Sequence, residues 1–215
     1  MSNTKQTPQP PRSALVTRLD ALRESLRLIP VNLLVGRTGA HYQALGAERG
    51  EFRLTLVDSP LIITHPGFQI FDAQGNELSS FNQAMVMYYL HTADGTQPTG
   101  KWISFAELPD GRVYDSAFQG STGDILVKAF GLEVDSLQQA CGKLDGMPQS
   151  GYGDVAYVFS ALPRVPIMVN YWCGDEDFPS TCKLLFDESV SHYLPIEACA
   201  VLGGTLACKL IKNTA

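Results

Sequence analysis

Apolar side chains recur every three or four residues in five stretches of the chain, which predicts five α-helices. The clearest stretch covers residues 13–29, and Pro30 ends it. Its stripe consists of Leu15, Leu19, Leu22, Leu26 and Ile29. The other predicted helices cover residues 78–92, 123–130, 134–144 and 194–212. Residues 31–46 have a weaker pattern, because Gly36 and Gly39 interrupt it, and we expect a weak helix or two turns there.

Apolar and polar residues alternate in other stretches, which is typical of strands. The predicted strands cover residues 51–58, 61–66, 68–72, 155–162, 167–173 and 182–187. Strands and helices come in blocks, and short turns join several strands. This order favours an α+β fold with one mainly antiparallel sheet covered by helices. We expect a mobile N-terminal tail over residues 1–13 and a single globular domain over residues 14–215.

Composition limits the classes of function. Hydrophobic residues make up 45% of the 215 residues and charged residues 18%, which is enough for a sizeable core. The net charge of −6 argues against a nucleic-acid partner, because phosphate contacts need a basic surface. No apolar run reaches the roughly 18 residues of a membrane span, and the N-terminus lacks the apolar centre of a signal peptide. We therefore expect a soluble, cytoplasmic protein without a membrane partner.

A turn rich in carboxylates lies between two apolar runs near the C-terminus. It contains Asp175, Glu176 and Asp177, which could offer oxygen ligands to a divalent cation. The alternative is a solvated turn in which Asp175 binds main-chain amides. Cys173 and Cys182 flank this turn, either as a reactive thiolate pair or disulfide, or as small apolar residues at strand ends.

His192 is a weak candidate for a general base. It follows Asp187 and Glu188, and a carboxylate–histidine pair can move a proton near neutral pH. The alternative is a surface histidine close to the start of a helix. None of the four histidines has the spacing of a paired metal ligand.

Aromatic residues form the feature that most resembles a ligand site. Flat aromatic walls suit a planar cofactor or an apolar substrate, although such residues also fill cores. The candidate ligand-binding residues are Trp102, Phe105, Tyr114, Phe118, Trp172 and Phe178. We expect the loop that bears Trp102 and the acidic turn to border one shared cavity.

Several motifs occur in an order typical of one family. They are the segment GKWISFAELPDGRVYDSAF at residues 100–118, followed by residues 153–156, 162–166, 172–179 and 185–187. Over about Leu15 to Ile211 the chain resembles the uncharacterised domain-of-unknown-function family numbered 3786, found in anaerobic bacteria and archaea. Some relatives carry an N-terminal iron–sulfur module with four cysteines, akin to one in corrinoid proteins. This chain departs from that pattern, because its first cysteine is Cys141.

Three functions remain open. The leading hypothesis is an accessory protein of anaerobic metabolism that binds a small ligand or a planar cofactor of tetrapyrrole or corrinoid type. The alternative is a metal-assisted hydrolase or lyase, in which the acidic turn holds the ion and His192 acts as base. The third is a protein–protein adaptor, which an exposed apolar patch would indicate.

Overall fold

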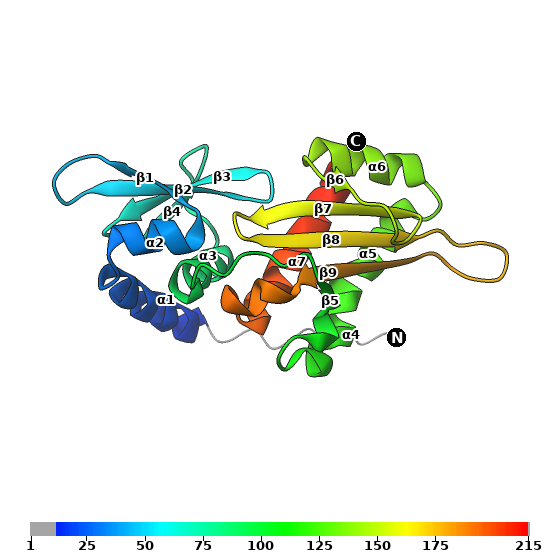
Figure 1. Ribbon diagram of the computed structural model, residues 1–215, viewed down its shortest axis with the longest axis horizontal. Coiled ribbons are helices and arrows are strands. Elements are labelled where there is room, and N and C mark those ends of the chain that lie inside the picture. Colours follow the sequence, from blue (N-terminus) through cyan, green and yellow to red (C-terminus); the bar gives the residue numbers. More distant parts are fainter. Residues whose placement is uncertain (1–11, 215) are drawn as a thin grey trace.

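The computed structural model describes residues 12–214 and contains two antiparallel sheets, each with helices packed on one face (Figure 1). The first sheet is a meander in the order β1-β2-β3-β4. Its strands are β1 (His41–Ala44), β2 (Gly50–Leu56), β3 (Ser59–His65) and β4 (Ile70–Asp72). The second sheet has the order β5-β9-β8-β7-β6. Its strands are β5 (Trp102–Ser104), β6 (Met147–Pro148), β7 (Val155–Leu162), β8 (Val165–Trp172) and β9 (Thr181–Asp187).

Helices α1 to α3 pack on the first sheet, whereas α4 to α7 lie on the second (Figure 1). The helices are α1 (Arg12–Arg27), α2 (Val31–Thr38), α3 (Ser80–Thr92), α4 (Gly111–Ser121), α5 (Gly123–Phe130), α6 (Val134–Lys143) and α7 (Ile196–Lys212). Two short 3₁₀ helices, η1 (Phe105–Glu107) and η2 (Glu188–His192), follow β5 and β9. Within residues 12–214, no helix is both long enough and apolar enough to cross a bilayer.

One buried core runs through both halves of the molecule. Helix α3 packs against α7, and Tyr89 stacks on Tyr193 with ring centroids 5.7 Å apart. The turn between β2 and β3 also reaches the second sheet, because the main-chain N–H of Val57 donates to the carbonyl of Ala161 at 2.8 Å. The predicted α+β class is confirmed, with two antiparallel sheets in place of the one expected.

The structure adds elements that the sequence pattern did not predict. Strand β1 lies inside the stretch predicted as a weak helix or two turns, whose first half is α2. Helix α4 begins at Gly111, directly after Pro109 and Asp110, in a segment where these turn residues hid the helical spacing of its apolar side chains. Both depend on partners distant in sequence: Tyr42 of β1 packs on Phe52, and α4 buries Phe118 against β9. Residues 1–11 of the predicted tail lie outside the described part of the chain, and α1 begins at Arg12.

Candidate functional site

The acidic turn is the tip of the β8–β9 hairpin, which the sequence predicted. The Asp175 carboxylate accepts hydrogen bonds from the main-chain N–H groups of Asp177 (2.9 Å) and Phe178 (2.8 Å). One of the three acidic side chains therefore holds the turn itself, and Glu176 and Asp177 are exposed. Among residues 12–214, no three His, Cys, Asp or Glu side chains are placed to share a metal ion.

Cys173 and Cys182 do not form a disulfide, and all five cysteines are free thiols. Cys182 lies opposite Tyr171 in the ladder and is buried, whereas Cys173 is half-buried. Burial raises the pKa of both thiols, and the nearby Asp154 carboxylate contributes to the rise at Cys173. Raised pKa values keep these groups as thiols, so the arrangement favours small apolar residues over a reactive pair.

The predicted aromatic residues are divided between the core and two separate surfaces. Phe105 and Phe118 are buried, and their rings stack with centroids 4.0 Å apart. Tyr114 is exposed on α4, and Phe178 is 72% exposed in the hairpin turn. Phe105 and Phe118 thus bury their faces against each other.

The two tryptophans lie at opposite ends of the second sheet. Trp102 pairs with Asp187 at one end of β9, and Trp172 pairs with Thr181 at the other. Six residues of strand separate these positions, which is about 20 Å. The expectation of one cavity shared by the Trp102 loop and the acidic turn is therefore wrong.

His192 is at the Asp187 end of β9, far from the acidic turn. Its Nδ1 lies 2.7 Å from Oδ2 of Asp94 and 3.3 Å from the hydroxyl of Thr96. A hydrogen bond from the Thr96 amide, followed by the one from His192, holds the pKa of Asp94 well below its usual range. The predicted carboxylate–histidine pair exists, but its carboxylate is Asp94, which is 98 residues away in sequence and which no local pattern indicated.

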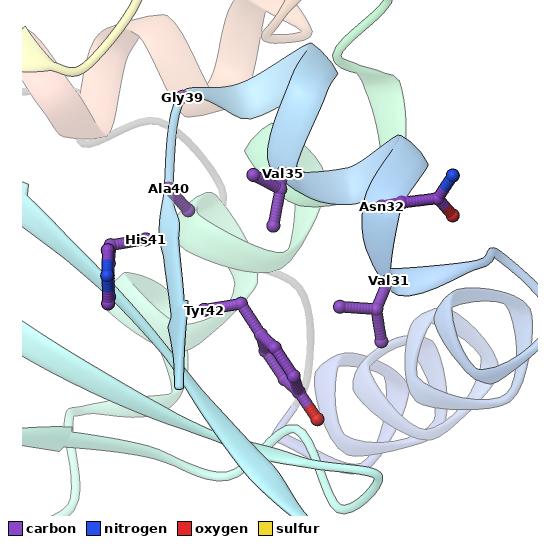
Figure 2. A pocket seen from close by; sticks show the side chains of 7 residues that line it. All are labelled: Val31, Asn32, Val35, Gly39, Ala40, His41 and Tyr42. Atoms are coloured by element: carbon purple, nitrogen blue, oxygen red, sulfur yellow. The ribbon is translucent and has the colours of Figure 1, made fainter. Parts of the chain in front are cut away.

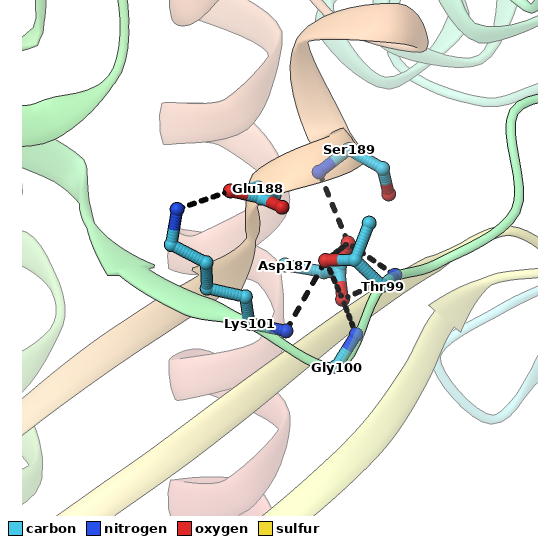
Figure 3. A network of polar contacts seen from close by, with 6 residues as sticks. All are labelled: Thr99, Gly100, Lys101, Asp187, Glu188 and Ser189. Atoms are coloured by element: carbon cyan, nitrogen blue, oxygen red, sulfur yellow. Dashed lines mark hydrogen bonds and ion pairs between the residues drawn. The ribbon is translucent and has the colours of Figure 1, made fainter.

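Asp187 joins the loop before β5 to the end of β9 (Figure 3). Its buried carboxylate accepts main-chain hydrogen bonds from Gly100 (2.6 Å), Thr99 (3.0 and 3.1 Å) and Ser189 (3.0 Å). Burial favours the protonated form, but the hydrogen bonds from Ser189, Thr99 and Gly100 outweigh it and lower the pKa. Asp187 is therefore a structural anchor, while the neighbouring Glu188 pairs with Lys101 at the surface.

A cavity of about 360 Å³ lies where α4 and α5 meet β9. The Gln119 amide borders it and donates to the carbonyl of Cys182 (2.7 Å) and to Asp124 (3.2 Å). Helix α5 approaches so closely that a Cβ at Gly123 would lie 2.1 Å from the same Cys182 carbonyl. This contact covers the edge of β9 that β5 leaves unpaired.

The larger of the two hollows is a groove of about 780 Å³, wide open to solvent, between α2 and β1 (Figure 2). Its apolar lining comes from Val31 and Val35 of α2 and from Ala40 and Tyr42 on the β1 side. Asn32, Gly39 and His41 complete the lining. The side chains of Val31, Val35 and Tyr42 point into the space between the helix and the strand (Figure 2).

Local sequence explains how the groove forms. Pro30 precedes α2, and Gly39 ends it in the left-handed region at φ 69°. The Thr38 hydroxyl then accepts from the Ala40 N–H, which directs the chain into β1. Tyr42 is fixed by its ring contact with Phe52, at a centroid distance of 4.9 Å. Gly39 was the sequence signal of this turn, whereas Gly36 lies inside α2, and neither glycine indicated a groove.

A model of one family matches residues 33–209, which is most of the chain. The chain belongs to the family described as Domain of unknown function (DUF3786). The match includes most of the groove and all of the second sheet. No curated protein and no solved structure matches the chain.

Proposed function

We propose that this DUF3786 protein is a non-catalytic accessory protein that binds its ligand in the α2–β1 groove. The observation that carries the proposal is the groove itself, because its volume of about 780 Å³ lies within the range of ligand sites. Four apolar residues line it, and the side chains of Asn32 and His41 at its border point away from the space between helix and strand (Figure 2). A mostly apolar wall is a common character of ligand sites, and this groove has one.

The other candidate regions support the proposal indirectly. The hydrolase or lyase alternative needs His192 beside the acidic turn, and the structure separates them along β9. A planar tetrapyrrole or corrinoid as the ligand stays a prediction. Phe105 and Phe118 cannot offer their ring faces to it, because the two rings already stack on each other. If such a cofactor binds, we propose that it enters the groove.

The cellular setting is part of the same proposal. The resemblance to a family of anaerobic bacteria and archaea leads us to place the protein in anaerobic metabolism. The cytoplasm is the compartment we propose, because it keeps the five free thiols reduced.

A pair of tryptophan variants on α2 tests the groove. Asn32→Trp adds a bulky ring at a residue that borders the groove and leaves the core untouched, because Asn32 is exposed. Leu33→Trp makes the same substitution at the adjacent exposed position, which does not line the groove. Haem, cobalamin, flavin mononucleotide and anilinonaphthalene sulfonate serve as probes, followed by absorbance or fluorescence titration.

The expected result is that at least one probe binds the unmodified protein and Leu33→Trp alike. Its affinity for Asn32→Trp should fall by about tenfold or more. Circular dichroism and thermal unfolding confirm that both variants fold. Equal binding to both variants, or no binding by any probe, would contradict the proposal.

A further inference from the structure

Helix α2 forms one wall of the groove, and apolar packing fixes it only weakly. Of its eight residues only Leu34 and Thr38 are buried. On the side of β1, the groove itself separates the helix from the strand (Figure 2). An isolated helix of this length is unstable in water, so contacts from other segments hold it in place.

The C-terminal turn of α2 receives such contacts. The last carbonyl groups of a helix have no partner within the helix. Here the carbonyl of Gly36 accepts from the Arg164 guanidinium (3.3 Å), and the carbonyl of Thr38 accepts from the Tyr89 hydroxyl (2.5 Å). Two of the end carbonyls are therefore bonded by segments that are distant in sequence.

Arg164 lies in the turn between β7 and β8, in the second half of the molecule. Its guanidinium also donates to the Gln97 side chain (2.7 Å), and its main-chain N–H donates to the Tyr89 hydroxyl (3.2 Å). Because the same hydroxyl donates to Thr38, one tyrosine links the β7–β8 turn with the end of α2. Burial raises the pKa of Tyr89, which keeps its proton available for this bond.

The β7–β8 turn also approaches the lining of the groove. Gly39 borders the groove, and a Cβ at this residue would lie 3.4 Å from Cβ of Pro163 and 3.7 Å from Nε of Arg164. The positive charge of Arg164 lies at the C-terminal end of α2, where the helix dipole favours it. The turn thus supports both the end of α2 and the residue through which the chain enters β1.

We infer that Arg164 is a positioning residue for the groove, which holds the α2 wall at the distance from β1 that the ligand requires. This inference rests on the proposed function, because it concerns the same groove. It gives the second sheet a part in ligand binding, although that sheet does not line the groove. By linkage, a ligand that needs this position of α2 strengthens the Arg164 contacts in turn.

Three variants test the role of Arg164. Arg164→Ala removes the guanidinium and keeps the main-chain bond to Tyr89. Arg112→Ala is the matched control, because it removes an exposed guanidinium from α4. Gln97→Ala is a milder change at an exposed residue and removes only the 2.7 Å contact.

The binding probes are haem, cobalamin, flavin mononucleotide and anilinonaphthalene sulfonate. Each titration is repeated in millimolar guanidinium chloride, far below the concentrations that unfold proteins, so that the free ion can replace the missing side chain. Hydrogen exchange of α2 and of the β7–β8 turn is followed with and without each probe.

We expect Arg164→Ala to weaken probe binding by about tenfold or more, Gln97→Ala to weaken it less, and Arg112→Ala to leave it unchanged. Guanidinium should restore part of the affinity of Arg164→Ala alone, which a general loss of stability would not allow. Hydrogen exchange in α2 should be faster in Arg164→Ala, and a bound probe should slow exchange in the β7–β8 turn of the unmodified protein.

Three outcomes would overturn the inference. Unchanged affinity in Arg164→Ala, together with a loss in Asn32→Trp, would do so and leave the proposed function standing. A loss that guanidinium does not restore, accompanied by a lower melting temperature, would assign Arg164 to general stability alone. No binding by any probe, even to the unmodified protein, would overturn the proposed function and this inference together.

Discussion

The two ends of β9 carry acidic residues in opposite settings. At one end Asp187 is buried and accepts main-chain hydrogen bonds from three residues in two segments (Figure 3). At the other end Asp175 accepts only from its own turn, and Glu176 and Asp177 face solvent. The turn with three adjacent carboxylates therefore makes fewer contacts to other segments than the single carboxylate of Asp187. The buried Asp187 carboxylate joins segments that are distant in sequence, whereas the three acidic residues of the turn contact only their own hairpin or solvent.

The aromatic residues follow the same division. Phe118 packs on Phe186 near the Asp187 end, with ring centroids 5.9 Å apart, and is 4% exposed. Phe178 lies in the acidic turn and is 72% exposed. The comparison therefore predicts a gradient of stability along β9, which substitutions can test.

The largest effect is expected for Phe118→Ala. Removal of this ring leaves a cavity beside Phe105 and Phe186, and such a change costs about 4 kcal/mol. Phe178→Ala is the matched control and should alter stability by less than about 0.5 kcal/mol. Urea unfolding monitored by circular dichroism measures both. A small loss for Phe118→Ala would mean that this ring is free to form a ligand wall.

Asp187→Asn comes next, with an expected loss of about 3 kcal/mol. The amide cannot accept from all the N–H groups of Thr99, Gly100 and Ser189, and its own NH₂ faces other donors. Glu188→Gln is the control, because it breaks only the exposed ion pair with Lys101 and should cost about 0.5 kcal/mol. Equal losses in the two variants would contradict the role of Asp187 as an anchor.

Acid should weaken the Asp187 end in a defined range of pH. The pKa of Asp187 is lower in the folded protein than in the unfolded chain, so its contribution is complete above the unfolded value near 4. The contribution disappears as the pH falls through the folded value. Unfolding free energy measured from pH 7 downwards should therefore decline in acid, and Asp187→Asn should decline less steeply. Parallel curves for the two proteins would contradict this assignment.

The sequence predicted the elements whose patterns are local. The stripes of α1 and α7, the boundaries of α5 and the β8–β9 hairpin needed only period and turn chemistry. Strand β1 was not predicted, because its four residues gain their conformation from pairing with β2. Propensity is a weak guide for so short a strand.

The candidate site was less accessible to sequence analysis for the same reason. The sequence analysis chose residues with ionisable side chains, such as Asp175 and His192, as site candidates, but neither borders the α2–β1 groove. The groove consists of ordinary apolar residues, and only packing of α2 beside an unexpected strand creates it. Asp94 and His192 meet because η2 and the loop after α3 come together in the fold.

Asp175→Ala should have a moderate effect at the acidic end. It removes the acceptor for the N–H groups of Asp177 and Phe178, which remain accessible to water, and we expect a loss of about 1 kcal/mol. Asp175→Asn retains an acceptor and should recover most of that loss. Failure of the asparagine to recover stability would show that the charge, and not the turn hydrogen bond, stabilises the hairpin.

The smallest effect is expected for the double variant Glu176→Gln, Asp177→Asn. Both side chains are exposed, and neither accepts a hydrogen bond from another described residue, so stability should change by less than about 0.5 kcal/mol. Titration calorimetry with Mg²⁺ and Ca²⁺ should give the same result for this variant and the unmodified protein. Ion binding that disappears in the double variant would restore the metal-site hypothesis. It would also reverse the comparison, because the turn would then be the functional end of β9 and Asp187 only its support.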